Sequence, residues 1–127
     1  MRRGLTTAYS GAGYLVAALV IVQFFLAGLG MFGASDFDAH KSVGGILHGI
    51  TGLVFLLAIA GPRTGRDIGM GLALLLITTL QMYLPDARDD APAVAAFHPL
   101  VALLVMGLAA HIGDRYLGRG RGSATPA

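Results

Sequence analysis

The chain contains no cysteine, and only 13% of its residues are charged. The absence of cysteine excludes disulfides, thiolate metal sites, iron–sulfur clusters and covalently attached c-type haem. Soluble domains average roughly 25% charged residues, so charge this sparse argues against a protein that folds in water. The net charge of +2 does not indicate a nucleic-acid partner, because the charged residues lie only at the ends of apolar runs.

Apolar residues, by contrast, are abundant. They make up 55% of the 127 residues, and the mean hydropathy is +0.71. A small fold leaves a large share of its area exposed and could not hide so much apolar surface from water. The sequence therefore predicts a single domain whose main partner is the lipid bilayer.

Four apolar runs are long enough to cross a bilayer, which takes about 20 helical residues. The predicted helices lie at about 8–31, 39–60, 67–84 and 92–113, within one transmembrane domain over 1–113. Residues 114–127 are predicted to form a disordered cytoplasmic tail, because this end of the chain is rich in Gly, Arg, Ser and Pro. No internal repeat is evident.

The short links between the runs predict an all-α, integral membrane, up-down-up-down four-helix bundle. Basic residues favour the cytoplasmic side of a membrane. One side of the predicted bundle holds seven of them (Arg2, Arg3, Arg63, Arg66, Arg115, Arg119 and Arg121), and the other side holds Lys41 and Arg88. We therefore expect both termini to be cytoplasmic, in the bacterial cytoplasmic (inner) membrane.

Polar side chains inside a bilayer are costly and by default mark function. His48 and His98, on the second and fourth predicted helices, fall at similar depths in the outer half, and His40 lies at the outer end of the second helix. Two imidazoles on diagonal helices suit the axial positions of a haem iron, whereas a zinc or copper site requires three or four protein ligands. The sequence predicts a b-type haem near the outer face, with His48 and His98 as iron ligands and His40 as the alternative to His48.

Two glutamines and two glycines complete the predicted cofactor site. Gln23 and Gln81, on the first and third helices, also fall in the outer half. Gly45 and Gly52 flank His48 at the four- and three-residue steps of a seam that faces neighbouring helices. Glycines there either let another helix approach closely or leave a flat void that a porphyrin would need. For the histidines and glutamines, the alternative is a purely structural role in interhelical hydrogen bonds.

Three short motifs carry a resemblance to known proteins. Phe37-Asp38-Ala39-His40, Gly44-Gly45-Ile46-Leu47-His48 and Phe97-His98-Pro99-Leu100 resemble a family of small uncharacterised four-helix bacterial membrane proteins. The layout is also similar to one four-helix half of haem A synthase and to b561-type cytochromes, which hold haem with histidines on separate helices. This likeness implicates His40 or His48 and His98. It does not extend to the synthase chemistry, because no acidic residue precedes a ligand histidine by three positions.

Three functions remain open from the sequence. The first is electron transfer or an oxidoreductase subunit, with a redox partner protein or a quinone. The second is a non-catalytic accessory or structural protein without a cofactor. The third is a small transporter or proton-conducting element, which is weakly supported because no inverted repeat is seen. No catalytic residue is predicted, and a homo-oligomer is compatible with each function.

Overall fold

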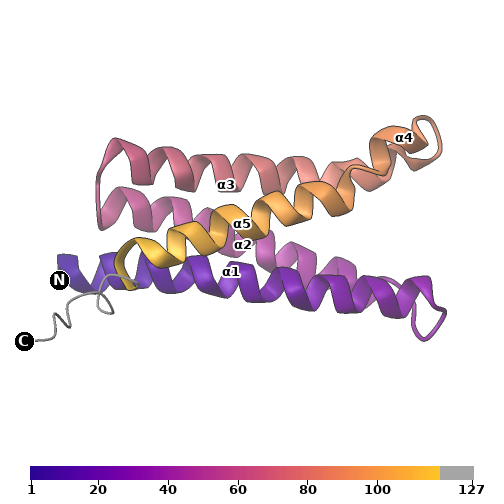
Figure 1. Ribbon diagram of the computed structural model, residues 1–127, viewed down its shortest axis with the longest axis horizontal. Coiled ribbons are helices and arrows are strands. Elements are labelled where there is room, and N and C mark those ends of the chain that lie inside the picture. The colour runs from indigo at the N-terminus through magenta and orange to yellow at the C-terminus, as the bar shows by residue number, and fades with distance from the viewer. Residues whose placement is uncertain (118–127) are drawn as a thin grey trace, which may run out of the picture.

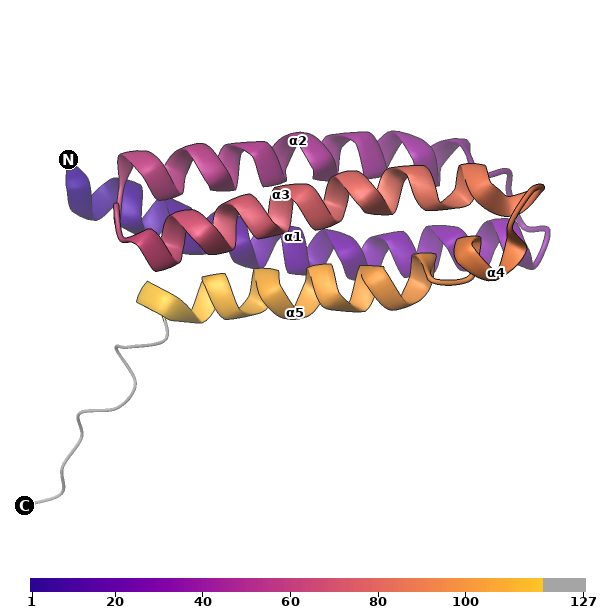
Figure 2. The same ribbon diagram turned by 90° about the horizontal axis from the view of Figure 1, so that it is seen from above.

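The computed structural model describes residues 1–117, in which all regular structure is helical. The elements are α1 (Arg2–Met31), α2 (Asp38–Ala60), α3 (Gly65–Tyr83), η1 (Leu84–Arg88), α4 (Pro92–Ala95) and α5 (His98–Leu117). The four long helices lie side by side (Figures 1 and 2), so the predicted all-α four-helix fold is confirmed. The N-terminus, the α2–α3 link and the end of α5 lie together at the terminal end of the bundle, and the α1–α2 link, η1 and α4 lie at the opposite, α4 end (Figure 1).

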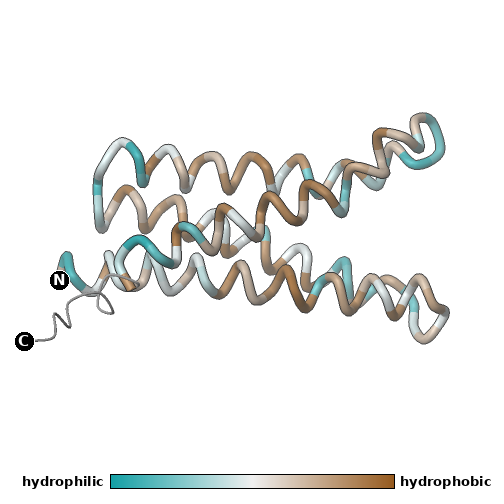
Figure 3. The backbone as a smooth tube through the Cα atoms, in the orientation of Figure 1, coloured by the Kyte–Doolittle hydropathy of each residue, from teal (hydrophilic) through white to brown (hydrophobic). Residues whose placement is uncertain are grey.

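All four spans (Arg2–Met31, Asp38–Ala60, Gly65–Arg88 and Pro92–Leu117) are long and apolar enough to cross a membrane. Hydrophobic residues dominate their middle portions, and hydrophilic residues gather at the ends (Figure 3). Large side chains such as Ile21, Phe25 and Leu104 are more than 60% exposed on the outside of the bundle. Apolar surface on this scale is rare on monomeric soluble proteins and suits contact with lipid.

Two helix ends extend well beyond the predicted ones. Helix α1 begins at Arg2 rather than near residue 8, so its basic end is already helical. Residues 114–117 belong to α5 and not to a disordered tail. Side chains in this last turn bond to neighbouring helices, from Asp114 to Tyr14 and from Arg115 to Asp67, which stabilises the helix beyond its apolar run. The rest of the predicted tail, 118–127, lies outside the described residues.

The predicted helix 92–113 is divided into α4 and α5, and the division follows from Pro99. Proline has no amide hydrogen to donate to the carbonyl four residues earlier, and its ring clashes with that carbonyl. The chain therefore leaves α4 at Ala95 and starts a new helix at His98, with Pro99 in the first turn, where its missing donor is not needed. This break makes His98 the first residue of α5.

Helix α5 runs obliquely, close to α3 at its start and close to α1 at its end (Figure 1). Gly13 permits the close crossing with α1. A β-carbon at this position would lie 2.8 Å from the Ala109 carbonyl oxygen and 2.9 Å from the Gly113 amide nitrogen. Both are backbone atoms, which cannot move aside without shifting the helix. Gly71 plays the same part between α3 and α2, where a β-carbon would lie 3.1 Å from the Phe55 α-carbon.

We expect Gly13→Ala to destabilise the protein by about 1–3 kcal/mol, the usual cost of overpacking. Gly11→Ala is the matched control on the same helix, because a β-carbon there meets no atom within 4 Å. Alanine also has the higher helix propensity, so this control should be neutral or slightly stabilising. Thermal unfolding in detergent, followed by circular dichroism, measures both variants; equal melting temperatures would contradict a close crossing at Gly13.

The bundle is built from two equivalent helical hairpins, residues 9–59 and 67–117, offset by 58 positions. The offset pairs one buried residue with another along both hairpins: Tyr9 with Asp67, Val16 with Leu74, Val20 with Thr78, Leu47 with Val105, Thr51 with Ala109 and Val54 with Ile112. Gly13 and Gly71, the glycines at the two close helix crossings, are separated by the same 58 positions. An internal repeat is therefore present, contrary to the expectation from the sequence. Few of the paired residues are identical, so the repeat is not visible as a repeated sequence motif.

Candidate functional site

His40 and His98 lie face to edge inside the α4 end of the bundle. Their ring centres are 6.1 Å apart, and their planes are inclined at 63°. His40 stands in the first turn of α2 and His98 begins α5, so both imidazoles enter the bundle from the same end. The Phe37 and His40 rings pack edge to face, with 6.2 Å between ring centres. The two histidines occupy equivalent positions in the two hairpins.

Each imidazole is tied to a neighbouring helix in the same way. His40 Nδ1 lies 3.2 Å from the Gln23 carbonyl oxygen, and His98 Nδ1 lies 3.0 Å from the Gln81 carbonyl oxygen. A carbonyl oxygen only accepts, so Nδ1 must donate and carries the proton of each neutral ring. Within residues 1–117, neither Nε2 has a hydrogen-bond partner. The two rings are thus held in the tautomer in which Nε2 offers a lone pair.

A cavity of about 280 Å³ lies between the four long helices at this end. It is lined mainly by apolar side chains, with the two histidines and two glutamines among them. The lining residues are Val20, Gln23, His40, Lys41, Gly44, Leu47, Thr78, Gln81, Met82, Pro85, Asp86, His98, Ala102 and Val105. Lys41, Met82, Pro85 and Asp86 are exposed, so the cavity reaches the surface beside them.

Gln23 and Gln81 leave buried polar atoms in this cavity. The Oε1 atoms of both side chains are shielded from solvent and have no hydrogen-bond partner within the described part of the chain. Gly44 makes room for one of the two amides, because a β-carbon there would lie 2.8 Å from Gln23 Nε2. An unpaired buried acceptor is costly. Buried acceptors of this kind are usually satisfied by an ordered water or a ligand, so this cavity is the candidate binding site.

Other predicted site residues lie elsewhere. His48 Nε2 is 2.9 Å from Thr79 Oγ1, and His48 does not line the cavity. Gly45 and Gly52 also lie outside the lining, and a β-carbon on either would meet nothing within 4 Å. The structure therefore brings together His40, His98, Gln23 and Gln81, and it leaves His48 and the two glycines apart from them.

Helical geometry explains why His40, and not the expected His48, stands opposite His98. Eight residues separate the two histidines of α2. At 3.6 residues per turn and 1.5 Å per residue, this turns the side chain by about 80° and moves it about 12 Å along the helix. His48 thus faces α3, where the Thr79 hydroxyl is within hydrogen-bond distance.

A second polar cluster, which sequence reasoning missed, lies at the terminal end around the fully buried Asp67. Arg115 binds its carboxylate through Nε at 2.8 Å and through Nη2 at 3.2 Å. The Tyr116 hydroxyl donates to the same carboxylate at 2.7 Å, and the Thr64 hydroxyl donates as well. The Tyr9 hydroxyl reaches the Asp67 main-chain oxygen at 3.2 Å.

This cluster is an interhelical clamp, because Arg115 and Tyr116 on α5 and Tyr9 on α1 all bond to Asp67 on α3. Thr64 caps α3 and accepts from the Asp67 amide, so the carboxylate sits at the positive end of the helix dipole. A threonine three residues before an acidic residue is a recognised helix-start signal. The sequence thus contained a sign of the cap but none of the partners on α1 and α5.

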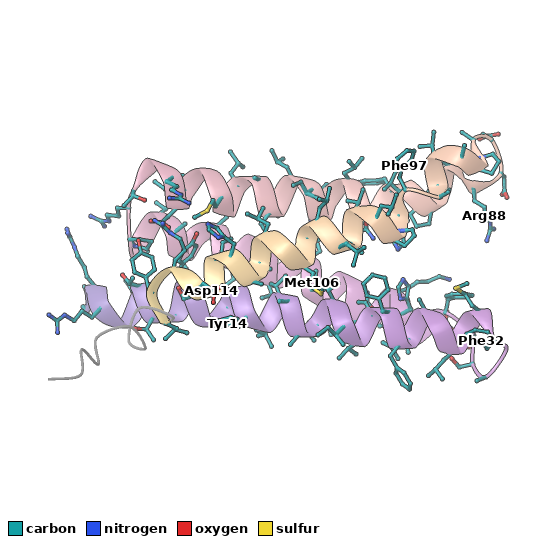
Figure 4. The ribbon with its side chains drawn as sticks, in the orientation of Figure 1. Tyr14, Phe32, Arg88, Phe97, Met106 and Asp114 are labelled. Atoms are coloured by element: carbon teal, nitrogen blue, oxygen red, sulfur yellow. The ribbon has the colours of Figure 1, made fainter. Side chains whose placement is uncertain are left out.

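The terminal end carries further polar contacts outside the clamp. The Tyr14 hydroxyl donates to Asp114 at 2.5 Å, joining α1 to α5 (Figure 4). Arg66 Nη2 lies 3.2 Å from His111 Nε2, joining α3 to α5. At the α4 end, by contrast, Phe32, Arg88 and Phe97 lie around the links between helices (Figure 4). Hydrogen bonds and an ion pair therefore join the helices at the terminal end, whereas the cavity opens to the surface at the α4 end.

The chain matches a protein-family model over part of its length. No curated protein and no solved structure matches the chain. A family of unknown function, DUF6220, matches residues 23–88. The matched segment begins at Gln23, includes His40 and Gln81, and ends before His98. Because it covers just over half of the 127 residues, the protein belongs to the DUF6220 family of unknown function.

Proposed function

We propose that the protein is a membrane-embedded b-type haem protein that transfers electrons, with His40 and His98 as the two axial ligands. The observation that carries this proposal is the distance of 6.1 Å between the two ring centres. An imidazole nitrogen lies about 2 Å from a metal ion that it binds and about 1 Å from its own ring centre, so two imidazoles on opposite sides of one ion have centres about 6 Å apart.

Several features of the site suit such a group, although the cavity of about 280 Å³ is smaller than a porphyrin, so the helices around it would have to move apart on binding. The hydrogen bond from Nδ1 to a carbonyl is the usual way in which a ligating histidine is oriented. Among residues 1–117, no group of three or more His, Asp or Glu side chains is placed to hold a bare metal ion. A haem iron needs only two protein ligands because the porphyrin supplies four. The largely apolar lining suits the macrocycle, and Lys41 near the surface offers a cation for a propionate.

A haem held by both His40 and His98 would support electron transfer and not catalysis at the metal, because two protein ligands would leave no position on the iron for oxygen or a substrate. The haem would accept electrons from a redox partner protein or a quinone. In this proposal His40 replaces His48 as the expected iron ligand on α2. The proposal does not depend on the resemblance to haem A synthase and b561 cytochromes, and that resemblance stays a prediction. Homo-oligomerisation also remains a prediction.

We further propose an up-down-up-down bundle in the bacterial cytoplasmic membrane, with both termini cytoplasmic. The charges support this orientation. Arg2, Arg3, Arg63 and Arg66 are exposed at the terminal end, where basic residues indicate the cytoplasmic side. At the α4 end, Lys41 and Arg88 are accompanied by Asp36, Asp38, Asp86, Asp89 and Asp90. The haem site would then lie near the outer face.

The alternative is an accessory protein without a cofactor, in which the histidines serve only to join helices. The bonds from His40 to Gln23 and from His98 to Gln81 favour it, because they would stabilise the bundle without a ligand. An optical spectrum of the detergent-purified protein, expressed with haem precursor, decides between the two. A Soret band with sharp α and β bands after dithionite reduction supports haem binding, whereas protein that stays colourless after haem addition overturns it.

A further inference from the structure

Four exposed arginines form a patch at the terminal end of the bundle. Two stand in the first turn of α1 and two stand around the α2–α3 link; this arginine patch consists of Arg2, Arg3, Arg63 and Arg66. The two pairs come together because the link packs against α1, where a β-carbon on Gly61 would lie 3.0 Å from the Leu5 carbonyl carbon. Hydrophilic residues gather at both places at this end (Figure 3).

Within residues 1–117, no acidic side chain neutralises the arginine patch, because none of its members forms an ion pair. The acidic residues at this end are Asp67, which is paired with Arg115, and Asp114, which accepts from a tyrosine of α1. Arg66 reaches His111 Nε2, and a nitrogen that accepts from a guanidinium belongs to an uncharged ring. The patch therefore presents positive charge that an anion from outside the chain can balance.

The place of the patch in the bundle indicates which anion this is. The patch lies at the end of four helices long and apolar enough to cross a membrane, which is the depth of phospholipid head groups. Guanidinium groups match the geometry of phosphate oxygens and bind them through paired hydrogen bonds. Leu15 and Leu72 are exposed farther along α1 and α3, so acyl chains below a bound phosphate would meet an apolar surface.

We propose that the arginine patch binds an anionic phospholipid by its phosphate, with the arginines of α1 and of the α2–α3 link on the same lipid. A lipid with a choline head group is disfavoured, because the patch repels the positive charge of the choline. This inference does not rest on the proposed haem. Arg63 offers a precise test, because its φ of 56° lies in the left-handed region that favours glycine. Arg63→Gly therefore removes a charge without straining the backbone.

The test is native mass spectrometry of the full-length protein in detergent, with phosphatidylglycerol and phosphatidylcholine of the same acyl chains in equal amounts. We expect phosphatidylglycerol to bind about tenfold or more tightly, since each arginine near an anionic lipid raises its affinity about fivefold. Arg2→Gln/Arg3→Gln and Arg63→Gly/Arg66→Gln should each reduce this preference. Arg88→Gln, which removes an exposed arginine at the α4 end, should leave it unchanged.

Equal binding of the two lipids would overturn the proposal and leave the arginines a role in orientation alone. A preference that either double variant keeps in full would also overturn it, because the two pairs would not share one lipid. Displacement of phosphatidylglycerol by excess inorganic phosphate, but not by chloride at equal ionic strength, would show a site for free phosphate instead of lipid. Circular dichroism checks folding, and Arg63→Gly alone replaces its double variant if Arg66→Gln impairs it.

Discussion

Protein carrying His40→Ala or His98→Ala is expected to lose the low-spin b-type spectrum, while His48→Ala retains it. Under the proposed assignment, each of the first two variants would lose one of the two histidines that hold the haem iron, so the Soret band would shift. Removing both is expected to abolish haem retention through purification. His48 bonds to Thr79 outside the cavity, so its loss costs one hydrogen bond, about 1 kcal/mol, and no iron ligand.

The measurement is the reduced-minus-oxidised spectrum of each purified variant at equal protein and haem concentrations. His111→Ala serves as a second control, because His111 lies at the terminal end beside Arg66. Circular dichroism establishes that each variant is folded. Loss of the α band in His48→Ala with retention in His40→Ala would show that the ligand on α2 is His48 and that the proposed pair is wrong.

Asp67→Ala is expected to be the most destabilising single substitution in the terminal half of the bundle. Asp67 is fully buried, and the Arg115 side chain is only 13% exposed. Removing one partner of a buried ion pair leaves the other charge uncompensated and typically costs about 3–5 kcal/mol. Tyr116 and Thr64 would lose their acceptor in the same step.

Two comparisons sharpen this prediction. Asp114→Ala removes an exposed carboxylate that accepts from Tyr14 on the neighbouring helix, and an exposed contact of this kind is worth about 1 kcal/mol or less. Asp67→Leu/Arg115→Met removes both charges and should recover much of the lost stability. Unfolding by SDS titration from mixed micelles measures the free energies. Equal values for Asp67→Ala and Asp114→Ala would contradict a buried clamp.

The clamp and the cavity lie at opposite ends of the same hairpins. Asp67 and Gln81 both belong to α3, and Arg115 and His98 both belong to α5. If the clamp only stabilises the bundle, Asp67→Ala protein that remains folded keeps the haem spectrum. We expect this outcome, because none of the clamp residues lines the cavity.

The sequence by itself determined four helices that are long and apolar enough to cross a membrane, and the kinds of polar residue inside them. The length and hydropathy of an apolar run can be read from consecutive residues. The thickness of the bilayer sets the run length that a helix needs to cross it, and this length is the same for every such protein. His98, Gln23 and Gln81 could be singled out for the same reason, since a polar residue within an apolar run is visible without a structure. The helix start near Pro99 also follows from a local property, because proline interrupts a helix and is tolerated in its first turn.

Only the tertiary structure decided which polar residues meet. The choice between His40 and His48 depends on the rotation of α2 against α5, and about 80° separates the two side chains around the helix axis. The sequence did not predict the bonds of Asp67, because Arg115 and Tyr116 lie 48 and 49 positions away along the chain. Contacts between distant segments follow from packing, and packing depends on shapes that residue type and spacing alone do not specify.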